Sequence, residues 1–265
     1  MEKCIAENGV VFYRSEKLSP VRHGFSTRLG GISTLDHTAA MNLAFGRGDD
    51  GRTVIGNLEL FCSALKINPR TVVSLPQVHS NNVLYVKEPL RGGGYFSDPG
   101  ICCDGYVTDR KNIALGVKIA DCVPILLSDN EAGVIAAIHA GWRGTALQIV
   151  ARGVKMMCEI GAAPHRIAAA IGPAIGQCCY EIGEEVVEQL TGLPSADQYI
   201  SPSKTAQNKY YADLKALNRA ILMRMGVPSD NIDISPLCTA CLSDLFHSHR
   251  KTGGVRGTML AVISL

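Results

Sequence analysis

The sequence has little net charge, few aromatic side chains and no long apolar run. Its 265 residues include 26 basic and 24 acidic side chains, which gives a formal net charge of +2. A chain with so small a positive excess is not expected to have DNA, RNA or an anionic membrane as its main partner. No apolar stretch approaches the ~18 residues of a membrane-spanning helix. Small molecules are therefore the expected ligands.

The sequence also lacks the features of a secretory signal. Residues 1–13 contain no basic segment followed by an apolar stretch of about 7–15 residues, so we predict a cytoplasmic location. The sequence does contain ten cysteines. In a reducing compartment they are expected to be thiols, metal ligands or nucleophiles rather than disulfides. The vicinal pairs Cys102–Cys103 and Cys178–Cys179 are expected to diverge or to pack singly, and Cys62 and Cys158 to serve as small apolar side chains of helices.

No repeat, low-complexity tract or linker divides the chain, so we expect one domain over residues 1–265. Short runs rich in Val, Ile and Leu predict strands at 10–13, 21–25, 72–75, 83–86, 105–108, 113–119, 125–128, 134–139, 167–171, 232–235, 246–249 and 259–263. Amphipathic patterns predict helices at 52–65, 145–160, 183–190 and 212–225. Loops are expected around 91–94 and 192–209. The short turn at 129–133 predicts a hairpin, and together the elements indicate an α+β fold with mixed, partly antiparallel sheets.

Three residues with metal-binding side chains lie at the ends of predicted strands. His79 follows the strand that ends at Leu75, Cys122 lies between two strands, and His139 closes another strand. Two imidazoles and one thiolate form a three-ligand zinc set that leaves a fourth position open, as in catalytic zinc sites. The long spacings match no local ligand motif, so packing of these residues at strand ends remains an alternative.

A glycine-rich turn leads from the third of these strands into a helix. The segment His139-Ala-Gly-Trp-Arg-Gly144 would present backbone N–H groups, and the Arg143 guanidinium could bind phosphate or another anion through two hydrogen bonds. The segment matches neither the dinucleotide-binding motif nor the P-loop motif. A tight turn that needs small residues for packing is an equal alternative.

Six blocks of the sequence together resemble the YfiH/YlmD family, whose members are also called laccase-domain proteins or multicopper polyphenol oxidases. The blocks, in chain order, are Pro76-Gln-Val-His79, Ala120-Asp-Cys-Val-Pro124, His139-Ala-Gly-Trp-Arg-Gly144, Ile171-Gly-Pro-Ala-Ile-Gly176, Cys238-Thr239 and Phe246-His-Ser-His-Arg250. The resemblance extends from His23-Gly-Phe-Ser-Thr-Arg28 to the predicted strand that ends at Ile263.

The resemblance implies a single layered α/β/β/α domain and a mononuclear zinc held by His79, Cys122 and His139. It also implies purine nucleoside phosphorolysis, with 5′-methylthioadenosine phosphorolysis and adenosine deamination as related activities. Adenosine, inosine or guanosine and phosphate would then be the small-molecule partners. The oxidase name refers to copper-dependent phenol oxidation, so copper is a second candidate cofactor.

Further residues acquire candidate roles from this chemistry. Cys122 and His139 are the expected catalytic centre, and Arg143 and Arg250 are candidates for binding phosphate or substrate. Asp121 is a candidate acid–base residue, although neighbouring residues on an extended chain point to opposite faces and Asp121 could instead cap a turn. Asn42 matches a family block and is a candidate to contact substrate or to orient a ligand, with a turn-forming role as the alternative.

Several other interpretations remain open from the residues. The sequence lacks the HxE motif of common zinc nucleobase deaminases, and Pro236-Leu-Cys238-Thr-Ala-Cys241 only approximates their cysteine motif. Cys238 and Cys241 could also form a CxxC redox or metal pair, but a single pair lacks its second half, so Cys238 is expected to be a packed thiol. Cys122 could be the nucleophile of a metal-independent hydrolase or deamidase, activated by His139. A non-catalytic metal-binding protein is the remaining alternative, and phenol oxidation is expected to be secondary because a single such site lacks a multinuclear copper cluster.

His247 and His249 are expected to share one face of a strand.

Overall fold

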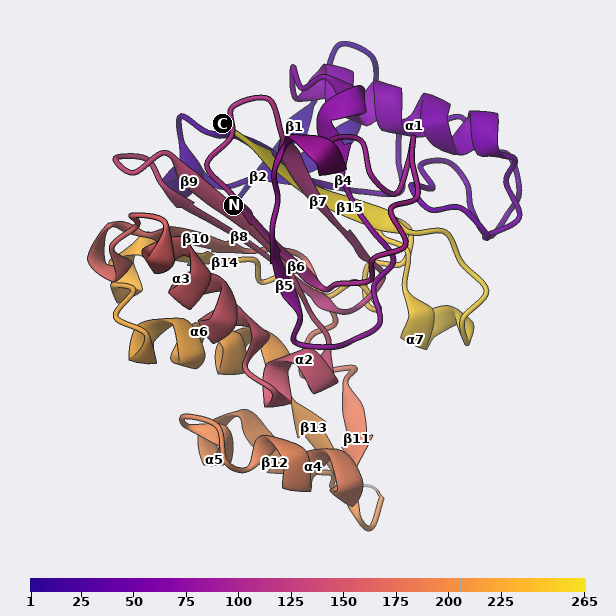
Figure 1. Ribbon diagram of the computed structural model, residues 1–265. Coiled ribbons are helices and arrows are strands. Elements are labelled where there is room, and N and C mark those ends of the chain that lie inside the picture. Colours follow the sequence, from indigo (N-terminus) through magenta and orange to yellow (C-terminus); the bar gives the residue numbers. More distant parts are fainter. Residues whose placement is uncertain (205) are drawn as a thin grey trace.

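Two stacked six-stranded sheets form the centre of the computed structural model, which describes residues 1–204 and 206–265 (Figure 1). The first sheet has the strand order β1 (Glu2–Ile5), β2 (Val11–Arg14), β3 (Arg22–Ser26), β15 (Met259–Ser264), β7 (Ala114–Ile119) and β4 (Val72–Val73). The second sheet has the order β14 (Ile232–Ile234), β10 (Ala168–Ile171), β8 (Val123–Asp129), β9 (Val134–Ala140), β6 (Gly105–Thr108) and β5 (Val83–Tyr85). Both sheets are mixed. In the first sheet, β7 pairs with β4 in parallel and with β15 antiparallel. In the second sheet, β10 pairs with β14 in parallel and with β8 antiparallel.

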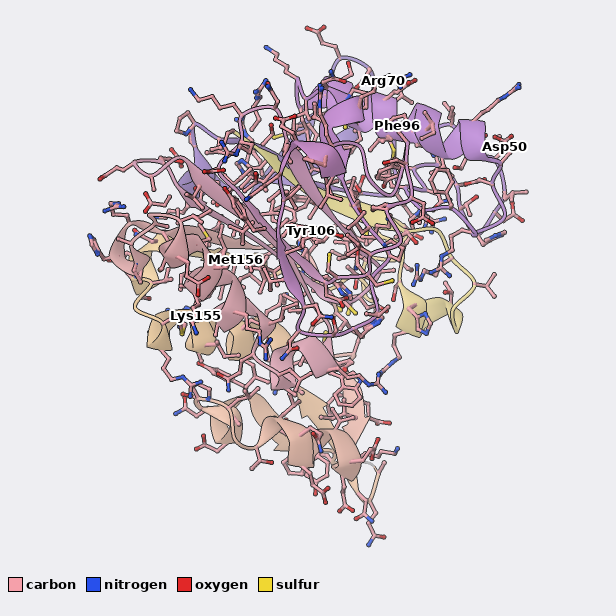
Figure 2. All side chains as sticks on the ribbon, in the orientation of Figure 1. Asp50, Arg70, Phe96, Tyr106, Lys155 and Met156 are labelled. Carbon is pink, nitrogen blue, oxygen red and sulfur yellow. The ribbon has the colours of Figure 1, made fainter. Side chains whose placement is uncertain are left out.

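Helices cover the outer face of each sheet. Helix α1 (Gly51–Ala64) packs on the first sheet, and α3 (Ile149–Glu159) and α6 (Leu214–Arg224) pack on the second (Figure 1). Helix α1 begins where the Asp50 carboxylate accepts a hydrogen bond from the Thr53 N–H at 2.8 Å, and Asp50 is labelled at that end of the helix in Figure 2. These layers confirm the predicted α/β/β/α arrangement with mixed sheets.

The apolar strands are buried on both faces, and alternate side chains enter different cores. In β8, Ile125 and Leu127 face the helices α3 and α6, whereas Leu126 faces the first sheet. In β9, Ile135 and Ala137 likewise face the first sheet. Tyr106 of β6 is buried in this central core and is labelled near the middle of Figure 2. The same alternation places His139 on the face between the two sheets, one residue before β9 ends.

A small third sheet extends from the second half of the chain, at the bottom of Figure 1. It consists of β11 (Glu181–Gly183), β13 (Lys209–Ala212) and β12 (Ile200–Pro202), with α4 (Glu184–Leu190) and α5 (Ala196–Tyr199) beside them. The predicted loop at 192–209 is therefore wrong over α5 and β12; residue 205 lies outside the described residues. These elements are three or four residues long and lack a sustained apolar alternation, so the sequence pattern could not indicate them.

Two other predicted elements differ from the structure. The helix predicted at 145–160 is divided into α2 (Trp142–Ala146) and α3, because Gln148 between them adopts a left-handed backbone with φ of 54°. The strand predicted at 246–249 is wrong. Ser248 caps the short helix α7 (His249–Thr252), with its hydroxyl accepting from the Lys251 N–H at 3.2 Å, and so His247 is buried while His249 is exposed.

Single turns of 3-10 helix complete the structure at Glu16–Leu18, Pro69–Thr71, Glu88–Leu90, Pro164–Arg166 and Ser229–Asn231. Across residues 1–204 and 206–265, none of the helices combines the length and the apolar character that crossing a bilayer requires.

Candidate active site

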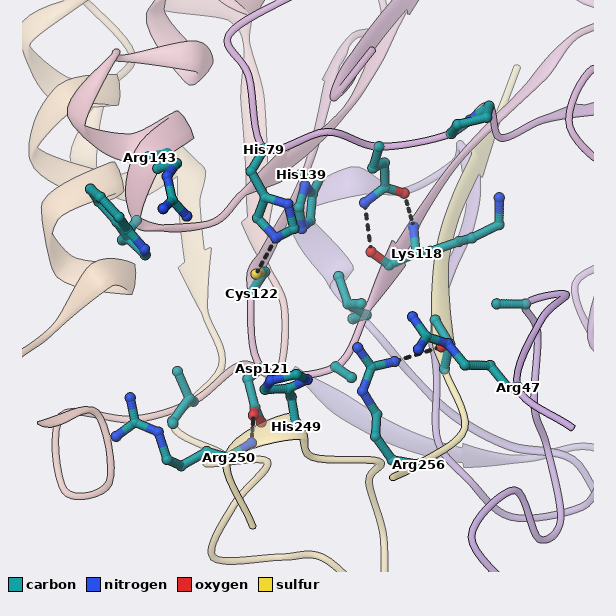
Figure 3. A pocket seen from close by; sticks show the side chains of 18 of the residues that line it. Arg47, His79, Lys118, Asp121, Cys122, His139, Arg143, His249, Arg250 and Arg256 are labelled. Atoms are coloured by element: carbon teal, nitrogen blue, oxygen red, sulfur yellow. Dashed lines mark hydrogen bonds between the residues drawn. The ribbon is translucent and has the colours of Figure 1, made fainter. Parts of the chain in front are cut away.

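His79, Cys122 and His139 meet at one rim of the stacked sheets (Figure 3). His79 lies in the loop after β4, Cys122 directly precedes β8, and His139 is carried by β9. Their candidate ligand atoms lie within 4.8 Å of one another. The Cys122 Sγ is 3.8 Å from the His79 Nε2, and the two imidazole rings stand edge to face with centroids 4.9 Å apart. The structure thus brings together all three residues of the predicted zinc set.

The carboxylate of Asp104, which is fully buried just before β6, holds both histidines. Its Oδ1 lies 2.9 Å from the His139 Nδ1 and accepts a hydrogen bond from the His79 N–H at 3.0 Å. Its Oδ2 accepts from the backbone N–H and the hydroxyl of Ser80, at 2.7 and 2.8 Å. Because Nδ1 of His139 is used in this way, Nε2 is the ring nitrogen left to bind a metal. Asp104 was not among the residues predicted from the sequence, where it stands only as a lone acidic residue before an apolar strand.

The same contacts shift the pKa values at this centre. Burial opposes ionisation of Asp104, but hydrogen bonds from His139 and Ser80 lower the pKa of its carboxyl to about 2. Burial would likewise raise the pKa of Cys122, yet the positive charge and hydrogen bond of His139 lower it to about 6. The thiolate of Cys122 and the carboxylate of Asp104 overcome the effect of burial on His139 and raise its pKa to about 9. Both shifts favour a thiolate–imidazolium pair in the metal-free centre.

The donor set fits zinc. One thiolate and two imidazole nitrogens are ligand types that Zn²⁺ prefers, and three protein ligands leave one of its four usual positions for another molecule. Gly141 packs directly against two of the donors: a Cβ atom at this position would lie 3.0 Å from the His79 Cδ2 and 3.1 Å from the Cys122 Sγ. A residue without a side chain is thus needed for the present arrangement of His79 and Cys122.

The three residues line a cavity of about 850 Å³, within the range of small-molecule sites. Basic side chains predominate among its charged residues, which are Arg47, Lys118, Arg143, Arg250, Arg256, Asp98 and Asp121. In Figure 3, Arg143 and Arg250 lie on one side of Cys122, and Lys118, Arg47 and Arg256 lie on the other. Such a cavity favours an anionic ligand or a substrate that binds together with an anion.

Protein groups already bind three of these cations. The Arg250 guanidinium donates to the backbone carbonyls of Cys179 and Glu181 at 2.9 and 3.0 Å. Arg256 donates to the Thr258 hydroxyl at 2.7 Å. The Lys118 ammonium donates to a backbone carbonyl, and burial lowers its pKa to about 8.

Arg143 and Arg47 differ from these three cations. Within residues 1–204 and 206–265, neither guanidinium donates a hydrogen bond to a protein group. Arg143 instead stacks on the Trp142 ring, with its Cζ 4.2 Å from the ring centroid. Both guanidinium groups are therefore available to an anion in the cavity.

Asp121 and Asn42 have structural partners. Asp121 lines the cavity, but its Oδ1 accepts from the Thr239 hydroxyl and its Oδ2 from the Arg250 N–H, both at 2.6 Å. Asn42 is fully buried and does not line the cavity; its amide bonds to the Ala44 carbonyl and the Asp49 carboxylate. The predicted substrate contact by Asn42 does not fit this placement.

The other cysteines and histidines divide between core and surface. Cys62 is buried in α1 and Cys158 is half-buried in α3, as expected for small apolar side chains. The expectation that Cys178 and Cys179 diverge or pack singly is wrong, because their sulfur atoms gather with those of Cys238 and Cys241. His249 lines the cavity, whereas His247 does not.

Comparison with known proteins agrees with this fold and arrangement. Residues 22–265 match the family model described as multi-copper polyphenol oxidoreductase laccase. The chain is 35% identical over 246 residues to "Purine nucleoside phosphorylase YlmD" of Bacillus subtilis, covering 91% of this chain and 87% of the relative. It is 37% identical over 231 residues to "Adenosine deaminase RL5" from an unknown prokaryotic organism, covering 86% and 88% of the two chains.

A solved structure extends the similarity to nearly the full chain. The structure of the hypothetical protein YfiH from Bacillus licheniformis superposes with a TM-score of 0.91 at 33% identity, covering 99% of this chain and 98% of the other. The matched model, the sequence relatives and the shared fold identify this chain as a member of the YfiH/YlmD family of laccase-domain proteins.

Proposed function

We propose that this protein is a zinc-dependent purine nucleoside phosphorylase. The observation that carries the proposal is the His79, Cys122 and His139 centre, which opens into a cavity where the Arg143 guanidinium is free to bind an anion. A nucleoside and a phosphate are together the size and charge that such a cavity accommodates. The name of the Bacillus subtilis relative supports the same substrate class.

Phosphorolysis forms a bond from a phosphate oxygen to the anomeric carbon and breaks the bond from that carbon to the purine nitrogen. The electron pair of the broken bond leaves with the purine, which then takes up a proton. Arg143 holds the phosphate through two parallel hydrogen bonds, and its stacking on Trp142 fixes the plane of the guanidinium. When bound, zinc supplies a Lewis acid at the open side of the three ligands.

The remaining residues of the cavity orient the reactants. His249 is exposed and faces the cavity, so its imidazole is placed to deliver a proton to the departing purine. Asp121 is a positioning residue in this mechanism, because both of its oxygens accept hydrogen bonds and one of them holds the backbone of Arg250. Arg250 forms part of the cavity wall rather than the phosphate site.

The test is phosphate-dependent release of free base from adenosine, inosine and guanosine by the zinc-loaded protein. Cys122→Ser and His139→Ala should each lose at least about 100-fold in turnover, since even outer-shell changes at a zinc site cost about 10–100-fold. Cys102→Ser, at an exposed cysteine outside the cavity, is the matched control and should keep wild-type turnover. If Cys122→Ser and His139→Ala also keep it, the site assignment is wrong.

The two free arginines allow the phosphate to be located. Arg143→Ala should raise the KM for phosphate by at least about 10-fold, because a bidentate charge-assisted contact is lost, with little change in the KM for the nucleoside. Arg47→Ala, at the other end of the cavity, is the matched control. If Arg47→Ala raises the KM for phosphate and Arg143→Ala does not, phosphate binds at the Arg47 end.

Adenosine deamination is proposed as a second activity of the same centre. The relative named as an adenosine deaminase supports it, and the open zinc position would serve both reactions. Inosine formation from adenosine without phosphate should disappear in Cys122→Ser together with base release. Loading the protein with copper instead of zinc, followed by an assay of phenol oxidation, tests the activity named in the description of the family model.

One observation favours a different candidate function. Asp104, His139 and Cys122 are arranged as in a hydrolase triad, with the carboxylate 2.9 Å from the His139 Nδ1 and the thiol beside the ring. A metal-independent cysteine hydrolase or deamidase would use Cys122 as its nucleophile. Zinc bound to the thiolate would block that reaction, so hydrolysis of amide substrates that increases when metal is removed would favour the hydrolase over the phosphorylase.

A further inference from the structure

Four cysteines from two distant segments converge outside the zinc centre described above. Cys178 and Cys179 lie in the segment between β10 and β11, and Cys238 and Cys241 lie in the segment after β14. The four sulfur atoms lie within 4.8 Å of one another. Packing of small apolar residues does not account for this cluster, because Cys178 and Cys241 are exposed and only Cys238 is buried.

The spacing of the sulfur atoms suits a tetrahedral metal ion. The Cys241 Sγ lies 3.5 Å from the Cys178 Sγ and 3.4 Å from the Cys179 Sγ. Four sulfurs placed at about 2.3 Å around a tetrahedral Zn²⁺ are about 3.8 Å from each other. The observed separations are close to this value and well beyond the ~2.05 Å of a disulfide.

Backbone hydrogen bonds hold the two segments together independently of a metal. The Thr239 N–H donates to the Ala174 carbonyl at 3.1 Å, in a parallel bridge that pairs Ala174 with Cys238. Within the first segment, the Cys179 N–H donates to the Gly176 carbonyl at 3.0 Å and closes a turn. The Gly176 N–H donates to the Cys238 Sγ at 3.2 Å, which is the kind of contact that stabilises a thiolate ligand. A Cβ atom at Gly176 would lie 3.2 Å from the Cys238 Cβ and 3.5 Å from the Cys238 Sγ, so glycine permits the close approach of the two segments.

We infer that Cys178, Cys179, Cys238 and Cys241 form a structural zinc site. Each thiol releases its proton to solvent as Zn²⁺ binds, and the four thiolates fill all four positions of the ion. Four thiolates leave no position for substrate, in contrast to the His79, Cys122 and His139 centre. The site joins the end of the second sheet to the start of the small third sheet.

The position of this site connects it to the cavity wall. Tyr180, which follows Cys179, lines the cavity, and the Arg250 guanidinium donates to the Cys179 carbonyl at 2.9 Å. A metal at the four cysteines would therefore fix the backbone on which Arg250 and Tyr180 are held.

The experiment uses the full chain with the first zinc centre removed by His79→Ala and Cys122→Ser. After purification under reducing conditions with zinc and dialysis, elemental analysis should find about one zinc per chain in this variant. Adding Cys238→Ser and Cys241→Ser should reduce the content to none. Cobalt in place of zinc should give the intense thiolate-to-cobalt absorption of a four-thiolate tetrahedral site.

Single substitutions keep the test informative if the fourfold variant does not fold. In the His79→Ala and Cys122→Ser background, Cys178→Ser should weaken the thiolate-to-cobalt absorption by about one quarter, in proportion to the thiolates lost. Cys102→Ser, the matched control, should leave it unchanged. A folded background variant that takes up neither zinc nor cobalt overturns the inference. So does an intact mass showing the loss of two hydrogens through a disulfide among these cysteines under the same conditions.

Discussion

At the scale of single residues, the candidate active site depends on a buried carboxylate that does not itself face the substrate cavity. Asp104 is fully buried and does not line the cavity, yet it contacts the ring of one proposed ligand and the backbone of another. Its role is to fix the tautomer of His139 and the position of the loop that carries His79. Residues of this kind are nearly as important to metal affinity as the ligands.

Asp104→Asn should weaken zinc binding by about 10–100-fold, because the amide cannot accept from every N–H that the carboxylate now satisfies and loses the charge that supports His139. The measurement is competition with a chelator of known affinity, on variants shown to be folded by circular dichroism. Asp98→Asn removes the same charge from the cavity at an exposed position and is the matched control. Equal affinities for Asp104→Asn and the wild type would contradict the role assigned to Asp104.

The thiolate of Cys122 should persist to mildly acidic pH in metal-free protein. Its pKa is lowered to about 6 from an ordinary 9.0, so the group is ionised above about pH 6 and takes up a proton only as the pH falls through that value. The difference in thiolate absorbance between the wild type and Cys122→Ser, followed against pH, reports this group alone. In a His139→Ala background the midpoint should move up toward 9.0. A midpoint near 9 with His139 present would show that no thiolate–imidazolium pair forms.

At the scale of elements, the turn between β9 and α2 decides how closely the metal ligands approach. Gly141 caps α2 with an extended backbone, φ −69° and ψ 176°, which any residue can adopt. The requirement for glycine therefore comes from contact with His79 and Cys122 rather than from backbone strain. The predicted helix at 145–160 begins three residues after α2 does and runs through Gln148, whose left-handed backbone separates α2 from α3.

Gly141→Ala should reduce zinc affinity by about 10-fold, the lower end of the loss that misplaced ligands cause, with a smaller effect on thermal stability. The new Cβ would press on the His79 ring and the Cys122 sulfur, which must move by a few tenths of an ångström. Gly192→Ala is the control, since a Cβ there meets no atom within 4 Å. Metal titration of both variants measures the effect, and unchanged affinity in Gly141→Ala would refute the steric argument.

At the scale of the whole molecule, the first and the last strands of the chain lie in the same sheet. Strand β15 lies between β3 and β7, and all six of its residues are buried. Strand β1 is at the edge of the same sheet and is mostly exposed. The last strand is therefore part of two cores, whereas β1 covers little apolar surface.

Ala261→Asp in β15 should prevent accumulation of soluble folded protein, because an unpaired carboxylate would be buried between the two sheets. Lys3→Asp in β1 is the control and should leave a folded protein with a Tm close to that of the wild type, since exposed substitutions usually change stability by less than about 0.5 kcal/mol. Soluble yield and thermal unfolding compare the two variants. A soluble Ala261→Asp variant with a wild-type Tm would mean that Ala261 is not buried between the two sheets.

The sequence by itself predicted the α+β class with mixed sheets, the long strands and three candidate zinc ligands, and its resemblance to the YfiH/YlmD family implied the layers. The apolar runs of β7, β8, β9 and β15 were recognisable because both faces of each strand are buried, and His139 continues the alternation of β9. Helix α1 was recognisable from its apolar period. The short elements of the third sheet were not, because three or four residues carry too little pattern.

Only the tertiary structure decided which polar residues are neighbours. Asp104 contacts His139 because β6 and β9 pair. Strands β10 and β14 are parallel neighbours, so the segments that follow them leave the sheet at the same end. This brings Cys178 and Cys179 together with Cys238 and Cys241. The structure also distinguished Arg143, whose guanidinium stacks on the Trp142 ring, from Arg250, whose guanidinium is bound to backbone carbonyls. The physical reason is that local sequence specifies the period and the face of a strand, whereas the order of strands in a sheet sets which distant side chains share a site.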